Sequence, residues 1–145
     1  MVQANELRIG NLFYPINRSS RVHLPNKVAL KIIELKAFDV SAVMANENPA
    51  LIKNWHNIQY ADLSPIPLSP EILEKAGFDK TILSPYTDMP SYRFGKDAER
   101  VIFSGGSVFK YTSVNHFIKI ADAEYLHQLQ NLIYFLTGEE LNITL

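Results

Sequence analysis

Glu124 and His127 form the pair of residues whose types and spacing best match metal ligands on a helix. A Glu-x-x-His spacing puts both side chains on one helix face, as in di-iron carboxylate proteins. Such a site also needs a second copy of the motif and two further carboxylates, and the sequence has no second Glu-x-x-His. The other histidines, at 23, 56 and 116, have no ligand spacing. We therefore expect no metal and no other cofactor, and we interpret the histidines as structural or exposed residues.

Catalytic and phosphate-binding motifs are absent from the sequence. It contains no G-x-S-x-G, H-E-x-x-H, G-x-G-x-x-G or G-x-x-x-x-G-K-[ST] pattern. The stretch "FSGGSVF" at 103–109 resembles a phosphate loop faintly, but it lacks the lysine and a helix after it, and it favours a hairpin turn. Asp79, Asp88 and Asp97 are single carboxylates whose pairing no pattern predicts. We therefore expect a protein that is not an enzyme.

Positive charge gathers in one N-terminal stretch, 18–36. It holds five cations against one acid, Glu34: Arg18, Arg21, Lys27, Lys31 and Lys36. Together with Phe13 or Tyr14, these side chains could follow a nucleic-acid backbone. The other interpretation is that lysines on a strand keep the sheet soluble and discourage edge pairing. Nucleic-acid contact through these five residues is thus an alternative hypothesis.

The N-terminal half favours a small antiparallel sheet. The runs "KVALKIIEL" and "DVSAVM" are rich in β-branched residues with turn residues at their edges, which predicts strands at about 28–35 and 39–45. One form that such a sheet could take is an SH3-like barrel. Residues 46–69 contain three prolines and predict mostly loop.

The stretch "SPEILEKAGF" predicts a short helix with both ends specified. Ser69 suits the N-cap, and Pro70 suits the first helical position, where its missing N–H is not needed. Gly77 suits the left-handed position after the helix, and Phe78 can then cover Leu73 in a Schellman motif.

The C-terminal half predicts a three-stranded antiparallel meander, then a helix. "ERVIFSGGSVFKYTSVNHFIKI" gives two strands around Gly105-Gly106 and a third at about 115–120. Asp122 is the expected helix cap and Gly138 the expected helix end, and the alternating "LNITL" predicts a closing strand. Strands and helices in separate blocks indicate an α+β fold: a small sheet, a short capped helix, and a meander packed by one amphipathic helix and the closing strand.

The last helix, within "EYLHQLQNLIYFLTGEE" (124–140), has no charged side chain between Glu124 and Glu139. At 100° per residue, half of its surface is apolar and should face the core: Tyr125, Leu126, Leu129, Leu132, Ile133, Phe135 and Leu136. The opposite face carries uncharged polar groups, with His127, Gln130, Asn131 and Tyr134 as the candidate interaction face. Three alternatives are open: this face meets water, packs within the chain, or contacts another protein or a second copy.

Size and composition indicate one globular domain, 1–145, which could divide into a β-rich subdomain (1–62) and an α+β subdomain (63–145). The net charge of -1 gives no overall field that would attract nucleic acid, and the absence of cysteine excludes disulfides and thiolate chemistry. No signal peptide and no run of eighteen apolar residues is present, so we expect a cytoplasmic protein with no membrane contact.

Three stretches resemble a known group of proteins. They are "NELRIGNLFY" near the start, "PIPLSPEILEKAGF" in the middle and "YLHQLQNLIYFLTGEEL" at the end. In combination they resemble uncharacterised small proteins of phages and mobile elements in Bacteroides-group bacteria. The middle motif of that group often has tryptophan where Ile72 stands here. The resemblance implies a bacterial or phage protein, and it transfers no activity and no functional residue.

The function that we expect is that of a non-enzymatic phage or mobile-element accessory protein acting through protein–protein contacts. The C-terminal helix and strand are the expected contact surface, and self-association is one form that the contact could take. The alternative is a nucleic-acid-binding module that uses the basic N-terminal sheet.

Overall fold

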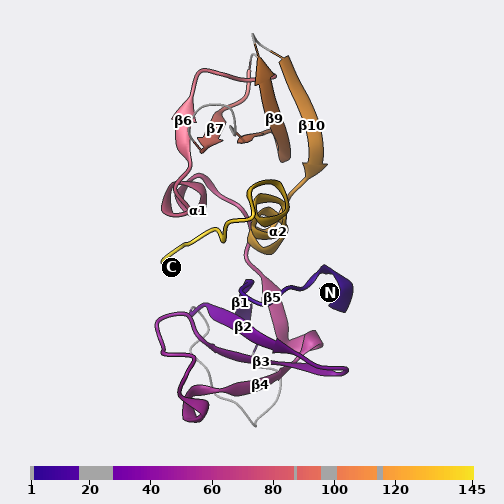
Figure 1. Cartoon of the computed structure of the whole chain (residues 1–145), viewed down its shortest axis with the longest axis vertical. Helices are drawn as coiled ribbons and strands as arrows, with labels where there is room; N and C mark the ends of the chain where they lie inside the picture. Colours follow the sequence, from indigo (N-terminus) through magenta and orange to yellow (C-terminus); the bar gives the residue numbers. More distant parts are fainter. Residues whose placement is uncertain (1, 17–27, 87, 96–100, 114–115) are drawn as a thin grey trace. The chain divides into compact units, whose positions relative to one another are not determined.

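A computed structural model describes residues 2–16, 28–86, 88–95, 101–113 and 116–145. Among them are two five-stranded antiparallel sheets and two α-helices, which confirms the α+β class (Figure 1). The strands are β1 (Leu12–Pro15), β2 (Leu30–Leu35), β3 (Asp39–Met44), β4 (His56–Gln59), β5 (Leu63–Pro65), β6 (Asp79–Thr81), β7 (Ser91–Phe94), β8 (Val101–Ser104), β9 (Ser107–Ser113) and β10 (His116–Asp122). The helices are α1 (Pro70–Lys75) and α2 (Leu126–Thr137), with 3-10 turns η1 (Ala4–Glu6), η2 (Ile52–Asn54) and η3 (Tyr60–Asp62).

The chain divides into two compact units. Unit 1 contains 1–67, Tyr125–His127 and Thr144–Leu145, and unit 2 contains 68–124 and 128–143. The sequence suggested a subdomain boundary after residue 62, and the units divide after Pro67.

Unit 1 is built on the sheet β4-β3-β2-β1-β5, in which every neighbouring pair is antiparallel. The predicted strands at 28–35 and 39–45 are confirmed as β2 and β3, which pair from Leu30↔Met44 to Leu35↔Val40. The first strand pairs with the last, and η3 lies between the last two strands. The SH3-like barrel form of this sheet stays a prediction.

One face of the unit 1 sheet carries its core, because side chains alternate between the two faces of a strand. The buried side chains gather from all five strands and from the N-terminal segment: Val2, Leu7, Phe13, Leu30, Ile32, Val40, Ala42, Ile58 and Leu63. Phe13, on β1 next to the edge strand β5, is completely buried.

Unit 2 is built on the meander β10-β9-β8-β7-β6. Gly105 and Gly106 form the tight turn between β8 and β9 with φ of 57° and 78°, so the predicted hairpin is confirmed. The third predicted strand is β10, which has two register shifts against β9. The sequence did not predict β6 and β7, which extend the meander on its other side.

Helix α1 follows the prediction from "SPEILEKAGF" at both ends. The Ser69 Oγ accepts a hydrogen bond from the Ile72 N–H at 3.2 Å. At the other end the Phe78 N–H donates to the Leu73 carbonyl at 2.9 Å, and the Gly77 N–H donates to the Glu74 carbonyl at 3.0 Å. These two bonds, with Gly77 at φ 84°, are the Schellman motif.

Removing the Ser69 hydroxyl should destabilise unit 2. Ser69→Ala leaves the first-turn N–H groups of α1 without their side-chain acceptor, which should cost about 1 kcal/mol. Amide hydrogen exchange of α1 measures this cost. Ser69→Asp keeps an acceptor and should retain most of the stability, and equal losses for the two variants would contradict the capping role.

Two expectations for the C-terminal region are wrong, and a third is confirmed. Asp122 does not cap α2, because it ends β10, where it accepts a hydrogen bond from Ser107 Oγ at 2.6 Å and pairs with Lys119 Nζ at 2.7 Å. These partners, Lys119 first, lower the pKa of Asp122. The "LNITL" stretch forms no strand, although Leu141 in it is buried. Gly138 does end α2, with φ 74° and its N–H donating to the Tyr134 carbonyl at 2.8 Å.

Candidate interaction surfaces

The predicted interaction face of α2 is largely inside the protein. His127 and Gln130 are only 1% and 2% exposed, Asn131 is half-buried, and Tyr134 is exposed. Phe135, expected in the core, is 82% exposed. The buried face of α2 therefore differs from the apolar face predicted by the sequence, because it includes His127 and Gln130 and leaves out Phe135. Of the three alternatives for this face, burial within the chain holds for His127 and Gln130, so these two residues are not available to a partner.

His127 occupies an apolar site in unit 1. Its ring lies 4.8 Å from the Phe13 ring and is stacked at 6.0 Å on the Tyr125 ring. Among the described residues, neither ring nitrogen has a hydrogen-bond partner. Burial lowers the pKa of His127, and the Glu6 carboxylate, with Oε2 at 4.0 Å from Nε2, opposes that shift without cancelling it. Burial therefore favours the neutral form of the imidazole.

The basic segment is described only in part. Arg18, Arg21 and Lys27 lie outside the described residues, whereas Lys31 and Lys36 are exposed on or beside β2. Lys36 is not a free cation, because its Nζ lies 3.6 Å from Glu34 Oε2 and 3.7 Å from Asp39 Oδ1. Two carboxylates thus offset the charge with which Lys36 would meet a phosphate.

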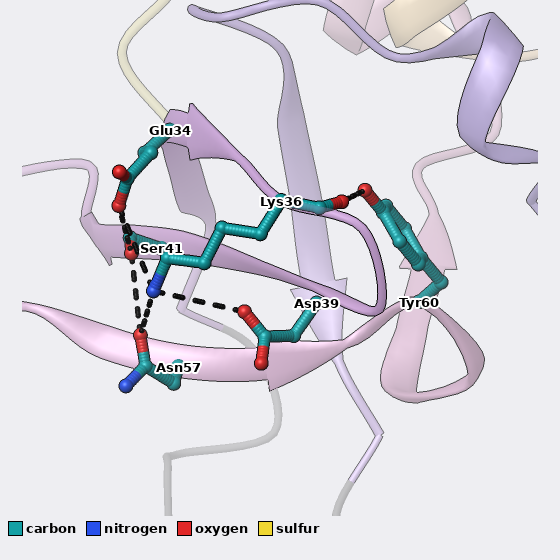
Figure 2. A network of polar contacts seen from close by, with 6 residues as sticks. All are labelled: Glu34, Lys36, Asp39, Ser41, Asn57 and Tyr60. Atoms are coloured by element: carbon teal, nitrogen blue, oxygen red, sulfur yellow. Dashed lines mark hydrogen bonds and ion pairs between the residues drawn. The ribbon is translucent and has the colours of Figure 1, made fainter.

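Lys36 belongs to a polar network across three strands (Figure 2). Glu34, Ser41 and Asn57 are register partners on β2, β3 and β4, so their side chains point to one face. The Ser41 Oγ donates to Glu34 at 2.8 Å and lies 3.2 Å from Asn57 Oδ1, which also accepts from Lys36 Nζ at 2.9 Å.

The network also ties down the turn between β2 and β3, because the Tyr60 hydroxyl donates to the Lys36 carbonyl. Among the described residues, no three His, Asp or Glu side chains are grouped as metal ligands would be. These contacts connect the side chains of β2, β3 and β4 and should stabilise this part of the sheet.

Unit 2 carries an apolar hollow, which we name pocket A. It has a volume of about 200 Å³ and almost entirely apolar walls. Its main walls come from the start of α1, the residues before β7, and strands β7 and β8: Pro70, Leu73, Met89, Pro90, Tyr92 and Phe103. Leu73, Tyr92 and Phe103 are buried, while Met89 and the two prolines are exposed at the rim.

Unit 2 carries two further hollows. Pocket B, of about 350 Å³, is lined by Lys80, Thr81, Ile82, Pro90 and Ser91. Pocket C, of about 360 Å³, is lined by Ile82, Leu83, Ser84, Pro85 and Phe117. Pro90 is a wall of both A and B, and Ile82 is a wall of both B and C. We name pockets A, B and C together the pocket row of unit 2.

The walls of the pocket row are held by specific contacts. The Ser91 hydroxyl is hydrogen-bonded to those of Ser84 at 2.6 Å and Ser104 at 3.0 Å, and the Ser104 hydroxyl donates to the Pro90 carbonyl at 3.3 Å. The hydrogen bond from Ser104 thus holds the backbone of Pro90 in place.

Met89 is held over the turn between β8 and β9. A Cβ on Gly105 would lie 2.7 Å from the Met89 Sδ, so this glycine makes the close approach possible. Gly105 therefore serves both the turn, through its positive φ, and the position of Met89.

Sequence reasoning missed the pocket row because its walls come from separate loops and short strands. A weak signal was present in "TILSPYTDMPSY" (81–92), where apolar residues alternate with prolines and small polar residues without helical or strand periodicity. Such a stretch predicts loop, and the exposure of Ile82 and Met89 in that loop could not be read from it.

Comparison with known proteins identifies no similar protein. No family model, no curated protein and no solved structure matches the chain. Within the described ranges, no helix is long and apolar enough to cross a membrane.

Proposed function

We propose that this chain is a non-enzymatic accessory protein of a bacterial phage or mobile element, which acts in the cytoplasm through protein–protein contacts. The assignment to a phage or mobile element rests on three motifs, at 5–14, 65–78 and 125–141, which resemble small proteins of such elements. The mode of action is suggested by the pocket row of unit 2. This surface replaces the polar face of α2 as the proposed contact site, because His127 and Gln130 are buried.

The observation that carries the proposal is the exposure of large apolar side chains along the pocket row. Ile82 is fully exposed and Met89 is 51% exposed, and both border hollows. Exposed apolar side chains that are scattered singly are ordinary, but apolar side chains around hollows with an apolar floor are typical of interaction sites. Methionine at such a surface adapts its shape to a partner.

Nucleic-acid binding, the alternative, has less support. Lys36 lies among Glu34, Asp39 and Asn57, and three of the five candidate cations lie outside the described residues. Retention on heparin that falls steeply with salt would favour this alternative, whereas passage at low salt would count against it.

Site-specific photo-crosslinking tests the proposed contact. A photoreactive phenylalanine analogue at Ile82 should give a discrete adduct with one partner protein in cells of a Bacteroides-group host that carry the gene. The same analogue at Phe38, an exposed residue of unit 1, is the control and should not give that adduct. The isolated partner should bind the purified chain and lose affinity for Met89→Lys by about 30-fold, as expected for a central apolar contact.

The proposal would be overturned by equal adducts from both positions, or by no adduct at Ile82 in cells that contain the folded chain. Light scattering of the purified chain at tens of micromolar separates a second copy from a different partner.

A further inference from the structure

We propose that the pocket row binds an extended segment of a partner polypeptide that presents an aromatic residue to pocket A and an acidic residue to pocket B. This inference rests on the proposed function and specifies the chemistry of the partner.

Pocket A fits a single aromatic ring. Its volume of about 200 Å³ compares with the cavity of about 150 Å³ that holds benzene in a well-studied apolar site. Its walls include a thioether, two prolines and two aromatic rings, contributed by Met89, Pro70, Pro90, Tyr92 and Phe103. Sulfur–aromatic and aromatic–aromatic contacts favour a ring over an aliphatic chain.

Pocket B supplies a positive charge. The Lys80 ammonium is exposed and has no ion-pair partner within the described part of the chain, unlike Lys36, Lys75 and Lys119. Lys80 is the register partner of Tyr92, a wall of pocket A, so the cation and the apolar pocket lie on the same side of β6 and β7. A carboxylate beside the aromatic group of the partner complements this charge.

Two neighbouring hollows, pockets A and B, favour a polypeptide over a small metabolite. A metabolite site is usually one cavity of about 300–1,000 Å³ with a few polar groups that fix orientation. Pocket A has almost no polar wall, and Pro90 separates it from pocket B. Side chains on one face of an extended segment are two residues and about 6.6 Å apart, which suits neighbouring hollows divided by one side chain. The segment that we propose carries its aromatic and acidic residues two positions apart.

Selection from a library of random peptides of about twelve residues, displayed on phage, tests the inference on the full chain. Binders that are lost on Met89→Lys should be enriched in an aromatic residue two positions from Asp or Glu. Replacing the aromatic residue of a selected peptide by alanine should raise Kd by about 30-fold or more. Replacing its acidic residue by lysine should raise Kd about fivefold at low salt.

The charge swap gives the sharpest readout. Lys80→Glu should weaken the acidic peptide and restore the binding of its lysine version. The control is Lys75→Glu, which makes the same change of net charge at a lysine that pairs with Glu71 at 2.9 Å and does not line the pocket row. This control should leave both peptides unchanged.

Three outcomes would overturn the inference. The assigned chemistry would be refuted by selected peptides that lack the aromatic–acidic pattern, or by peptides that bind Lys80→Glu as tightly as the wild-type chain. The proposed function would still stand in that case if the Ile82 crosslink forms. Binding of indole to pocket A without binding of any peptide would assign it to small molecules. A dimer that Met89→Lys dissolves would identify a second copy as the occupant.

Discussion

Phe13→Ala should lower the free energy of unfolding of unit 1 by about 3–5 kcal/mol, the usual cost of truncating a fully buried phenylalanine. Phe13 has no exposed surface, and it lies on β1 between its partners β2 and β5. The cavity left by its ring would also remove the surface on which His127 packs at 4.8 Å. Since domains are stable by about 5–15 kcal/mol, this one change should remove a large part of the total.

Denaturant unfolding followed by fluorescence measures this loss. Trp55 is the only tryptophan and belongs to unit 1, where its Nε1 donates to the Pro49 carbonyl at 2.8 Å, so its emission reports the state of this unit. Phe38→Ala is the matched control, because Phe38 is 86% exposed in the turn between β2 and β3. Its cost should stay within about 0.5 kcal/mol. A comparable loss for both variants would contradict the assigned core.

The elements that could be predicted from the sequence are those specified by nearby residues. Helix α1 has its cap, its first-turn proline and its terminal glycine within ten residues, so each signal acts locally. The hairpin at Gly105-Gly106 and strands β2 and β3 are likewise specified by residues close to them in the sequence. The short strands β6 and β7 were missed because three or four residues are too few to show an alternation.

The errors on α2 have a different origin. Hydrophobic periodicity assumes that the most apolar arc of a helix is the buried one. Here the orientation of the first turn is set by packing against Phe13, far away in the sequence, and His127 is buried while Phe135 is exposed. Likewise, Asp122 had the residue type of a cap, but cross-strand bonding to Ser107 placed it at the end of β10. The pocket row depends on the same long-range placement, and its only local signal was the weak pattern of residues 81–92.

Replacing His127 by leucine should stabilise unit 1 by about 1–2 kcal/mol at neutral pH, although it removes a polar group. Both ring nitrogens are buried, with no hydrogen-bond partner in the described part of the protein, and unsatisfied groups of this kind are costly. Leucine has a similar volume, forms helices well and suits contacts with Phe13 and Tyr125.

The gain should grow in acid. Because the pKa of His127 is lower in the folded protein than its ordinary value of about 6.5, the unfolded state binds more protons between the two values. Wild-type stability should therefore be at its full value above pH of about 6.5 and fall as the pH drops toward the folded pKa. Leucine at 127 removes this part of the pH dependence.

His116→Leu is the control, since His116 is exposed on β10, and it should leave both the stability of unit 1 and its acid dependence unchanged. Unfolding by denaturant, followed through Trp55 across this pH range, measures all three proteins. A loss of stability in His127→Leu at neutral pH would show that the imidazole makes a polar contact that stabilises unit 1. In that case the neutral, unpartnered histidine inferred from the packing around Phe13 would be wrong.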